Sequence, residues 1–214
     1  MLAMLQFANR FSLPVITSAA DSLIIPLHSI LDRLDLSKLF PAEQPLEVEL
    51  GCGDASFLVA YAGCHPRRNF IGVERLLGRL QKLDRKGRRV GLANTRGVRI
   101  ESSYFLQYLL PPHSVTALHI YFPDPWPKLK HHRHRLINES FPSLARLALL
   151  PGGIVYLRTD DLDYFTQMND AFSAAAFFER IETPARLAEI STDFERDFNS
   201  QGIPTLRAAY ALID

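Results

Sequence analysis

The sequence predicts an α/β fold in which helices cover both faces of a mostly parallel sheet. Short apolar runs alternate along the chain with longer segments whose apolar residues recur at helical spacing. Chains with this rhythm form parallel sheets, because the connection between two parallel strands crosses a face of the sheet and is usually a helix. The unusual residues of the chain also fall where predicted strands end, and ligands bind at that edge of such sheets.

Apolar periodicity places the strands and helices in order along the chain. The predicted strands are residues 46–50, 69–74, 97–101, 114–122, 154–160 and 205–212. The predicted helices are residues 57–64, 76–92, 134–148 and 161–176. The helix over 76–92 is amphipathic, with Lys and Arg residues on its outer face.

The chain is expected to divide into an N-terminal extension, residues 1–43, and a main domain, residues 44–214. Within the extension, apolar residues at helical spacing over 21–36 predict one amphipathic helix, with Asp21 or Ser22 as its cap. The prolines of "FPAEQP" end that helix, because proline interrupts helical hydrogen bonding.

Composition and charge are those of an ordinary soluble domain. With a formal net charge of +1, the chain as a whole should not attract nucleic acid, so any such attraction must come from local clusters. Cys52 and Cys64 fit no metal spacing and suit a reducing cytosol. The apolar N-terminus lacks the basic start of an export signal, and no apolar run reaches about 18 residues. We expect a cytoplasmic protein with no membrane partner and no bound metal.

The first candidate site lies at the ends of the first two predicted strands. Gly51 and Gly53 follow the first strand, where glycine lets the backbone turn tightly and approach a ligand. Glu74 ends the second strand, 23 residues after Gly51, close to the spacing at which an acid binds ribose hydroxyls. A plain glycine turn explains the loop alone, but the added acid favours a nucleoside-bearing cofactor.

Glu49 decides which nucleoside cofactor the sequence favours. It lies inside the first strand, just before the glycines, where its carboxylate can hold the amino group of an amino acid. Adenosine linked to an amino acid is S-adenosylmethionine. The dinucleotide fingerprint G-x-G-x-x-G is incomplete, because Ser56 occupies its third glycine position, which disfavours a nicotinamide oxidoreductase. Glu101, at the end of the third predicted strand, can accept from the adenine amino group or simply be a solvated acid.

The second candidate site is Asp124, which follows the fourth strand between Pro123 and Pro125. The two prolines restrict the backbone on either side, so the carboxylate is preorganised. A proline-rich turn with a capping Asp is the alternative. Trp126 is expected to lie in the core beneath this loop rather than to stack on a substrate.

A cluster of basic residues follows Asp124 directly. Its members are Lys128, Lys130, His131, His132, Arg133, His134 and Arg135. A solvated helix face would explain such a run, and a metal site lacks a carboxylate or cysteine ligand at a suitable spacing. Contact with nucleic-acid phosphates is the third interpretation, and the neighbouring rigid acid favours it.

These residues resemble a known family. "FPDPWPK" followed by "HHRHRL" closely resembles the signature of the bacterial tRNA (guanine-N7)-methyltransferases. "LEVELGCG", "FIGVE", "LRTDD" and "TDFERDFNSQGIPTLRAAYAL" resemble other parts of that family. The resemblance runs from about residue 44 to the end of the chain. The heptapeptide is highly specific, whereas the glycine loop is common to many proteins.

The resemblance implies a Rossmann-like class I methyltransferase that moves a methyl group from S-adenosylmethionine to N7 of a guanine in the variable loop of tRNA. It implies these cofactor-binding residues: Glu49, Gly51, Gly53, Glu74, Glu101 and Asp124. Asp124 is also the implied catalytic residue. The implied substrate-binding residues are Lys128, Asp160, Thr192 and Glu195. RNA contacts are implied for Lys130, His131, His132, Arg133, His134 and Arg135.

Two positions depart from the family pattern. Ala55 stands where the family loop has a further glycine, which matters if that position has a positive φ. Glu101 stands where the family more often has Asp. A same-fold methyltransferase acting on a small molecule or protein, which would not need the basic cluster, and a non-catalytic RNA-binding relative are the alternatives. Monomer and homodimer are both open.

Overall fold

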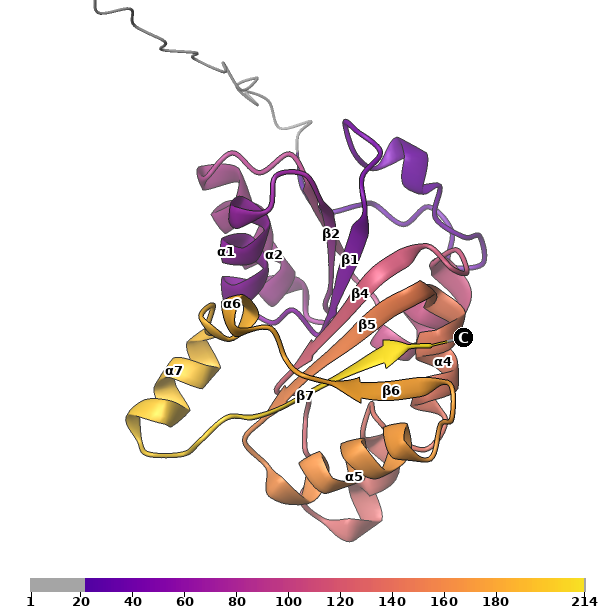
Figure 1. Ribbon diagram of the computed structural model, residues 1–214. Coiled ribbons are helices and arrows are strands. Elements are labelled where there is room, and N and C mark those ends of the chain that lie inside the picture. The colour runs from indigo at the N-terminus through magenta and orange to yellow at the C-terminus, as the bar shows by residue number, and fades with distance from the viewer. Residues whose placement is uncertain (1–21, 214) are drawn as a thin grey trace, which may run out of the picture.

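A computed structural model describes residues 22–213 and shows a seven-stranded sheet with helices on both faces (Figure 1). The strands are β1 Leu46–Leu50, β2 Asn69–Val73, β3 Thr95–Val98, β4 Val115–Tyr121, β5 Leu149–Thr159, β6 Phe178–Ile181 and β7 Leu206–Leu212. Their order across the sheet is β3-β2-β1-β4-β5-β7-β6. The first five strands are parallel, and β7 runs antiparallel to both β5 and β6. The predicted fold class is confirmed.

Helices and single turns connect these strands. The α-helices are α1 Ser56–Cys64, α2 Leu77–Arg89, α3 Ser102–Tyr104, α4 Phe141–Ala148, α5 Leu162–Ser173, α6 Ala185–Ala188 and α7 Asp193–Ser200. Shorter turns are η2 Leu36–Lys38 and η4 Leu129–His134, both 3₁₀, and the π-helical turn η3 Phe105–Leu109. In the part of the chain that the structure describes, no helix is long and apolar enough to cross a membrane.

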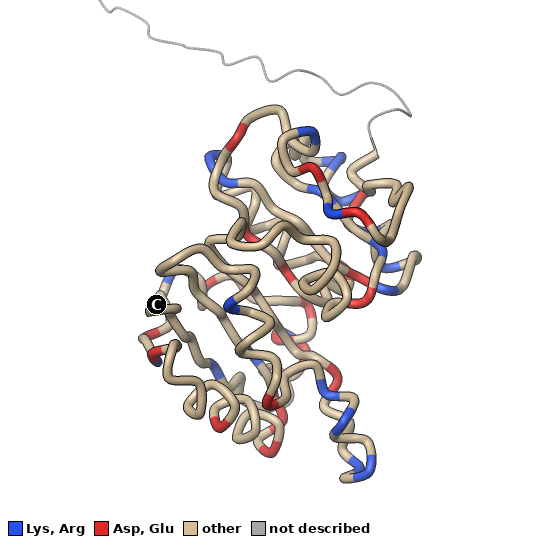
Figure 2. The backbone as a smooth tube through the Cα atoms, turned by 90° about the vertical axis from the view of Figure 1, so that its right-hand side faces the viewer, with Lys and Arg blue, Asp and Glu red and all other residues tan. Residues whose placement is uncertain are grey.

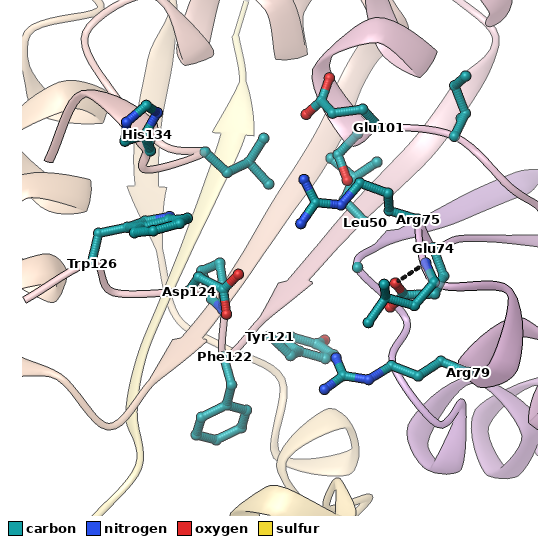
Figure 3. A pocket seen from close by; sticks show the side chains of 16 residues that line it. Leu50, Glu74, Arg75, Arg79, Glu101, Tyr121, Phe122, Asp124, Trp126 and His134 are labelled. Carbon is teal, nitrogen blue, oxygen red and sulfur yellow. Dashed lines mark hydrogen bonds between the residues drawn. The ribbon is translucent and has the colours of Figure 1, made fainter. Parts of the chain in front are cut away.

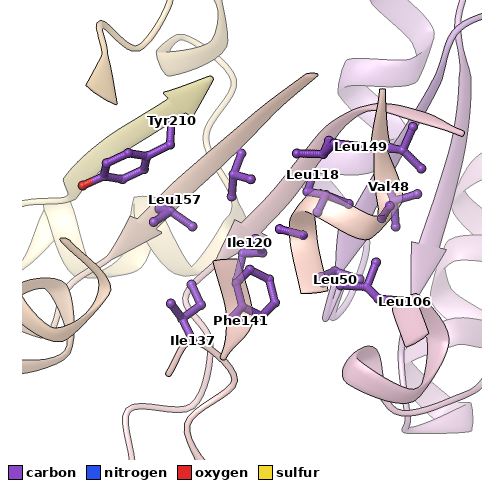
Figure 4. Close-up of a cluster of buried hydrophobic side chains, with 14 of the residues drawn as sticks. Val48, Leu50, Leu106, Leu118, Ile120, Ile137, Phe141, Leu149, Leu157 and Tyr210 are labelled. Carbon is purple, nitrogen blue, oxygen red and sulfur yellow. The ribbon is translucent and has the colours of Figure 1, made fainter. Parts of the chain in front are cut away.

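Two apolar clusters hold the layers together, one on each face of the sheet. On one face, Val48, Leu118 and Leu157 of the central strands pack with α4 and α5 (Figure 4). On the other face, α1 and α2 bring Phe57 and Leu80 against the sheet. Every residue of β1 is buried. Because side chains alternate across a strand, Glu47 and Glu49 point to the face opposite Val48. The acid beside the glycine loop is therefore enclosed under α1 and α2.

The predicted helix over residues 21–36 is wrong where the structure describes it, from Ser22 onward. This segment is irregular and runs beside β3: Leu23 O accepts from Gly97 N, and Ile25 N donates to Gly97 O, both at 2.8 Å. Pro26 has no amide to donate, which disfavours a helix there. The apolar residues cover the end of the sheet instead of forming a helical stripe.

Smaller differences concern the ends of elements. β3 begins and ends two to three residues earlier than predicted, so Glu101 follows it at a short distance. The predicted helix over 134–148 begins only at Phe141, because Arg135 is extended and Pro142 suits the first turn of a helix. The short strand β6 and the helices α6 and α7 were not predicted.

Candidate active site

The loop between β1 and α1 is built from left-handed backbone conformations. Gly51 has φ +75° and Gly53 has φ +54°, which glycine adopts without steric cost. Ala55 has φ 60° and ψ 25°, so the position of the family's further glycine does have a positive φ. An L-residue in this conformation costs roughly 1–2 kcal/mol. The amides of Gly51 and Cys52 donate to Val73 O at 2.8 and 2.9 Å, which ties the loop to β2.

Glu74 connects the glycine loop to the start of α2. Its Oε2 accepts from Gly53 N at 3.1 Å, and its Oε1 accepts from Leu76 N at 2.8 Å (Figure 3). The side chain is buried, and the residue lines the larger of two cavities at this edge of the sheet. Each carboxylate oxygen keeps a further lone pair, so Glu74 can still accept from a ligand.

Glu49 is a buried acid that lacks a hydrogen-bond partner on one oxygen. It is 3% exposed, and its Oε2 has no partner among the described residues. Burial raises the pKa of this carboxyl well above its ordinary value, although the charge of Arg158 opposes the shift. Glu49 lines the smaller cavity together with Gly51 and Gly53. A cationic group bound there would satisfy the free oxygen and stabilise its charge, so the site fits an amino group.

Glu101 lines the larger cavity but also caps a helix. Its two oxygens accept from Ser103 N at 3.0 Å and Tyr104 N at 2.8 Å, at the start of α3. The cap accounts for its place after β3, and each oxygen can accept one more hydrogen bond.

Asp124 lies exposed at the same cavity, on a loop whose backbone is strained on both sides. Phe122 has φ 51° and Trp126 has φ 47°, which are uncommon for large side chains. Phe122 N donates to Arg158 O at 2.8 Å, and Pro125 O accepts from Arg135 Nε at 2.7 Å. The side chain of Asp124 has no hydrogen-bond or ion-pair partner in residues 22–213. The loop therefore presents a free carboxylate in a fixed position.

Trp126 does not lie in the core, so that prediction is wrong. It is 36% exposed and lines the cavity with Asp124. Its ring packs against His134 and His131, with centroids 5.3 and 5.9 Å away. Figure 3 shows Trp126 and His134 on the same side of the cavity as Asp124. An aromatic wall beside the acid is thus open to a planar ligand.

The basic cluster divides into exposed and buried members. Lys128, Lys130 and Arg133 are exposed on a segment that projects at the lower right of Figure 2, with blue positions and no red one along it. His134 is exposed, while His131 and His132 are half-buried.

Arg135 is the exception because it is buried, and its implied contact with RNA stays a prediction. It is 2% exposed, lies over the Tyr164 ring, and donates to Gln167 Oε1 at 2.7 Å and to Asp163 Oδ2 at 2.6 Å. Together with the hydrogen bond to Pro125 O, these contacts connect the Asp124 loop to α5 through Arg135.

Glu195 is also buried rather than open to a substrate. It is fully buried, accepts from Arg158 at 2.8 Å through Oε2, and pairs with Arg207 through Oε1. Arg158 also donates to Ile190 O at 2.8 Å and to Leu187 O, and its guanidinium lies 4.3 Å from the centroid of the Tyr121 ring. Glu195 thus has a structural role in this arrangement, and its implied substrate contact stays a prediction.

Of the remaining implied substrate residues, only Thr192 lines one of the two cavities. Thr192 caps α7 by accepting from Glu195 N at 2.9 Å and lines the smaller cavity. Asp160 is half-buried directly after β5, and Lys128 is exposed at the start of η4. Neither Asp160 nor Lys128 lines the two cavities described here. The two cavities share Gly51, Tyr121 and Phe122, so they are adjacent.

Two arginines in the larger cavity had no predicted role. Arg75 and Arg79 line it, and Figure 3 shows both extending from the α2 side toward Asp124. The sequence offered a signal, since Arg75 directly follows Glu74, the acid just after β2. Among residues 22–213 there is no group of three His, Cys, Asp or Glu side chains that could hold a metal ion.

The fold and this site define a class: a Rossmann-like methyltransferase. Solved structures share the fold at low identity. A 16S rRNA methyltransferase, KamB, matches with a TM-score of 0.58 at 16% identity, covering 85% of this chain and 94% of that one. A precorrin-6y C5,15-methyltransferase from Geobacter metallireducens matches with a TM-score of 0.52 at 14% identity, covering 83% and 85%.

The family model described as "Putative methyltransferase" matches residues 43–208, and the chain belongs to this family. Its relatives include proteins named tRNA (guanine-N(7)-)-methyltransferase. That of Halorhodospira halophila is 34% identical over 76% of this chain and 73% of its own length. Those of Cutibacterium acnes and Thermotoga maritima are each 32% identical, over 84% and 80% of this chain. The chain spans 64% and 55% of the length of these last two relatives.

Proposed function

We propose that this protein transfers a methyl group from S-adenosylmethionine to N7 of a guanine in the variable loop of tRNA, in the cytoplasm, forming 7-methylguanosine. The observation that carries the proposal is Asp124, a free carboxylate fixed at a cavity beside an exposed cationic segment. The names of the relatives supply the substrate and the atom that is methylated.

The acids at the strand ends suit the cofactor. Glu49 binds the amino group, because its buried oxygen otherwise lacks a partner. Glu74 accepts from the ribose hydroxyls, and Glu101 accepts from the adenine amino group. Gly51 and Gly53 leave room for the ligand beside the backbone, since a Cβ at Gly51 would meet nothing within 4 Å. When bound, S-adenosylmethionine supplies a methyl group on a positively charged sulfur.

Asp124 acts on the guanine without taking a proton. The N7 of guanine carries a lone pair and no hydrogen, so the reaction needs no general base. The product ring is cationic, and a carboxylate that accepts from the N1–H and amino group both orients the base and stabilises the positive charge. Asp160, which directly follows β5 and lines neither cavity, is the second acid that we propose for this task. Positioning of this kind contributes about 7–11 kcal/mol in favourable cases.

The exposed cations hold the RNA around the base. Lys128, Lys130 and Arg133 neutralise phosphates, and the histidines beside them add hydrogen-bond donors. The guanine must leave its stacking partners to reach Asp124, at a cost of a few kcal/mol. The open face of Trp126 offers a new stacking surface. Thr192 contributes to the substrate side of the smaller cavity, and Glu195 supports it through Arg158.

The test is methyl transfer from labelled S-adenosylmethionine to unmodified tRNA, followed by borohydride–aniline cleavage to locate 7-methylguanosine. We expect cleavage at one guanine in the variable loop. Label that enters a protein or small molecule, and no RNA, would favour the same-fold alternative. A protein that binds tRNA but not S-adenosylmethionine would favour the non-catalytic alternative.

A further inference from the structure

More cations lie on the helix α2 and the residues just before it than on the segment after Asp124. Residues 75–89 contain seven of the chain's 24 Lys and Arg residues and a single acid, Asp84. The whole chain carries a formal net charge of only +1, so positive charge is concentrated here. Such concentration on one helix is the electrostatic pattern of nucleic-acid contact.

Most of these cations have no ion-pair partner among residues 22–213. Lys86 pairs with Asp54 at 2.6 Å, and Arg88 lies 3.8 Å from Asp84. The other five are exposed and have no ion-pair partner in the described chain: Arg75, Arg79, Lys82, Arg85 and Arg89. Unpaired cations this close together repel one another, so an external polyanion would stabilise them.

Helical spacing places four of them on one face of α2, and Arg75 lies just before the helix. We call these five residues the α2 stripe: Arg75, Arg79, Lys82, Arg85 and Arg89. Offsets of three and four residues place side chains on the same face of a helix. The opposite face is fixed on the sheet by Leu80 and Leu83. It is also fixed by Gly87, where a Cβ would lie 2.5 Å from Leu23 Cδ1. The stripe therefore faces outward over a helix about 20 Å long.

The α2 stripe begins inside the candidate active site. Arg75 and Arg79 line the larger cavity with Asp124 and Trp126, and they extend toward Asp124 from the opposite side (Figure 3). The basic segment after Asp124 lies on the other side of that cavity, so cationic surfaces flank it on both sides. A substrate that meets both must be a long polyanion rather than a single anion.

We propose that the α2 stripe is a second RNA-binding surface, which holds the phosphates on the side of the cavity opposite the segment 128–134. Arg75 and Arg79 contact the phosphates nearest the target guanine, and Lys82, Arg85 and Arg89 extend the contact along the RNA backbone. The proposal rests on the proposed function, because it takes tRNA as the substrate.

The test uses the full chain and a double variant outside both cavities, Lys82→Gln with Arg85→Gln. The control removes two exposed cations elsewhere, Lys38→Gln on η2 with Arg180→Gln on the edge strand β6. We would measure the Kd for unmodified tRNA between low and moderate salt and, separately, the Kd for S-adenosylmethionine. Removing one cation that neutralises a phosphate should lower the slope of log K against log salt by about 0.7–0.9.

We expect the Lys82 and Arg85 variant to bind tRNA about tenfold more weakly at low salt, with a reduced salt slope and unchanged cofactor affinity. The control should match the wild type in all three measurements. If both variants bind tRNA as the wild type does, the second surface is refuted while the proposed function stands. If the wild type binds cofactor but neither binds nor methylates tRNA, the proposed function fails and the second surface fails with it.

Discussion

The start of α7 and the loop after β4 each carry an acid from a family motif, yet the two acids differ in burial and in pairing. Glu195, in "TDFE", is fully buried between Arg158 and Arg207. Asp124, in "FPDPWPK", is exposed and has no side-chain partner within residues 22–213. A motif residue can therefore serve the reaction by holding the site in shape or by meeting the substrate.

Burial decides between these two roles. A buried charge must be paired, because leaving it unpaired costs several kcal/mol, and a fully buried carboxylate between two arginines is not accessible to a substrate. An exposed acid on a strained loop keeps its oxygens free, and its position is fixed by the backbone. Substitutions at the two acids should therefore change different quantities: the free energy of unfolding for Glu195 and the rate of methylation for Asp124.

Glu195→Ala should lower the free energy of unfolding by about 3–5 kcal/mol, because it leaves Arg158 and Arg207 without their shared carboxylate. Urea denaturation followed by circular dichroism measures this. Thr192→Ala is the control, since it removes only the cap of α7 and should lower the unfolding free energy by about 1 kcal/mol.

The opposite outcome for Glu195→Ala would show that Glu195, like Asp124, serves the reaction directly. If Glu195→Ala unfolds at the same urea concentration as the wild type but no longer methylates tRNA, then Glu195 contacts the substrate after all.

Asp124→Ala and Asp124→Asn should lower kcat for tRNA methylation by about 10²–10³-fold, because they remove the charge that stabilises the methylated base. The free energy of unfolding should change by less than about 0.5 kcal/mol, since the side chain is exposed and unpaired. Affinity for bulk tRNA should largely persist. Single-turnover methylation and filter binding measure the two effects.

The exposed acid Glu139, on the same connection between β4 and α4, provides a matched control. Glu139→Gln should retain wild-type activity. If Asp124→Ala methylates tRNA at the wild-type rate, Asp124 takes no part in the reaction.

Glu49→Gln should weaken S-adenosylmethionine binding by about 10- to 100-fold, because it removes a hydrogen bond between charged groups, and the loss of such a bond lowers affinity by about this factor. The same substitution should stabilise the cofactor-free protein, because a glutamine at this buried position has no charge to desolvate. Calorimetric titration measures the first effect and thermal unfolding without cofactor the second.

The pH dependence of Glu49 follows from the direction of its shift. Burial raises the pKa of the Glu49 carboxyl well above the ordinary 4.5. Its contribution to stability is complete below that ordinary value and is lost as pH rises through the raised pKa, because the folded protein holds the proton more tightly. The stability advantage of Glu49→Gln should therefore grow with pH. An advantage that shrinks with rising pH would mean that Glu49 is already ionised in the free protein.

Much of the fold could be predicted from local patterns. The strands β1, β2, β4 and β7 lie within one or two residues of their predicted bounds, since each is a short apolar run with clear turn signals. The glycine loop was predicted too, and Ala55 was identified as the position where a positive φ would matter. The helix over 21–36 was wrong, because its apolar spacing serves contacts with β3 that local periodicity does not contain.

The sequence by itself determined the parallel sheet, the glycine loop and the strand ends at which the acids lie, because these depend on neighbouring residues and on the alternation of strands and helices. Only the tertiary structure decided which charged residues are free. Arg158 and Glu195 are 37 residues apart, and Arg135 and Asp163 are 28 apart. A charged side chain is buried only where the folded chain brings it a partner. Residues distant in the sequence therefore decide whether a charged motif residue is paired inside the protein or is free to contact the substrate.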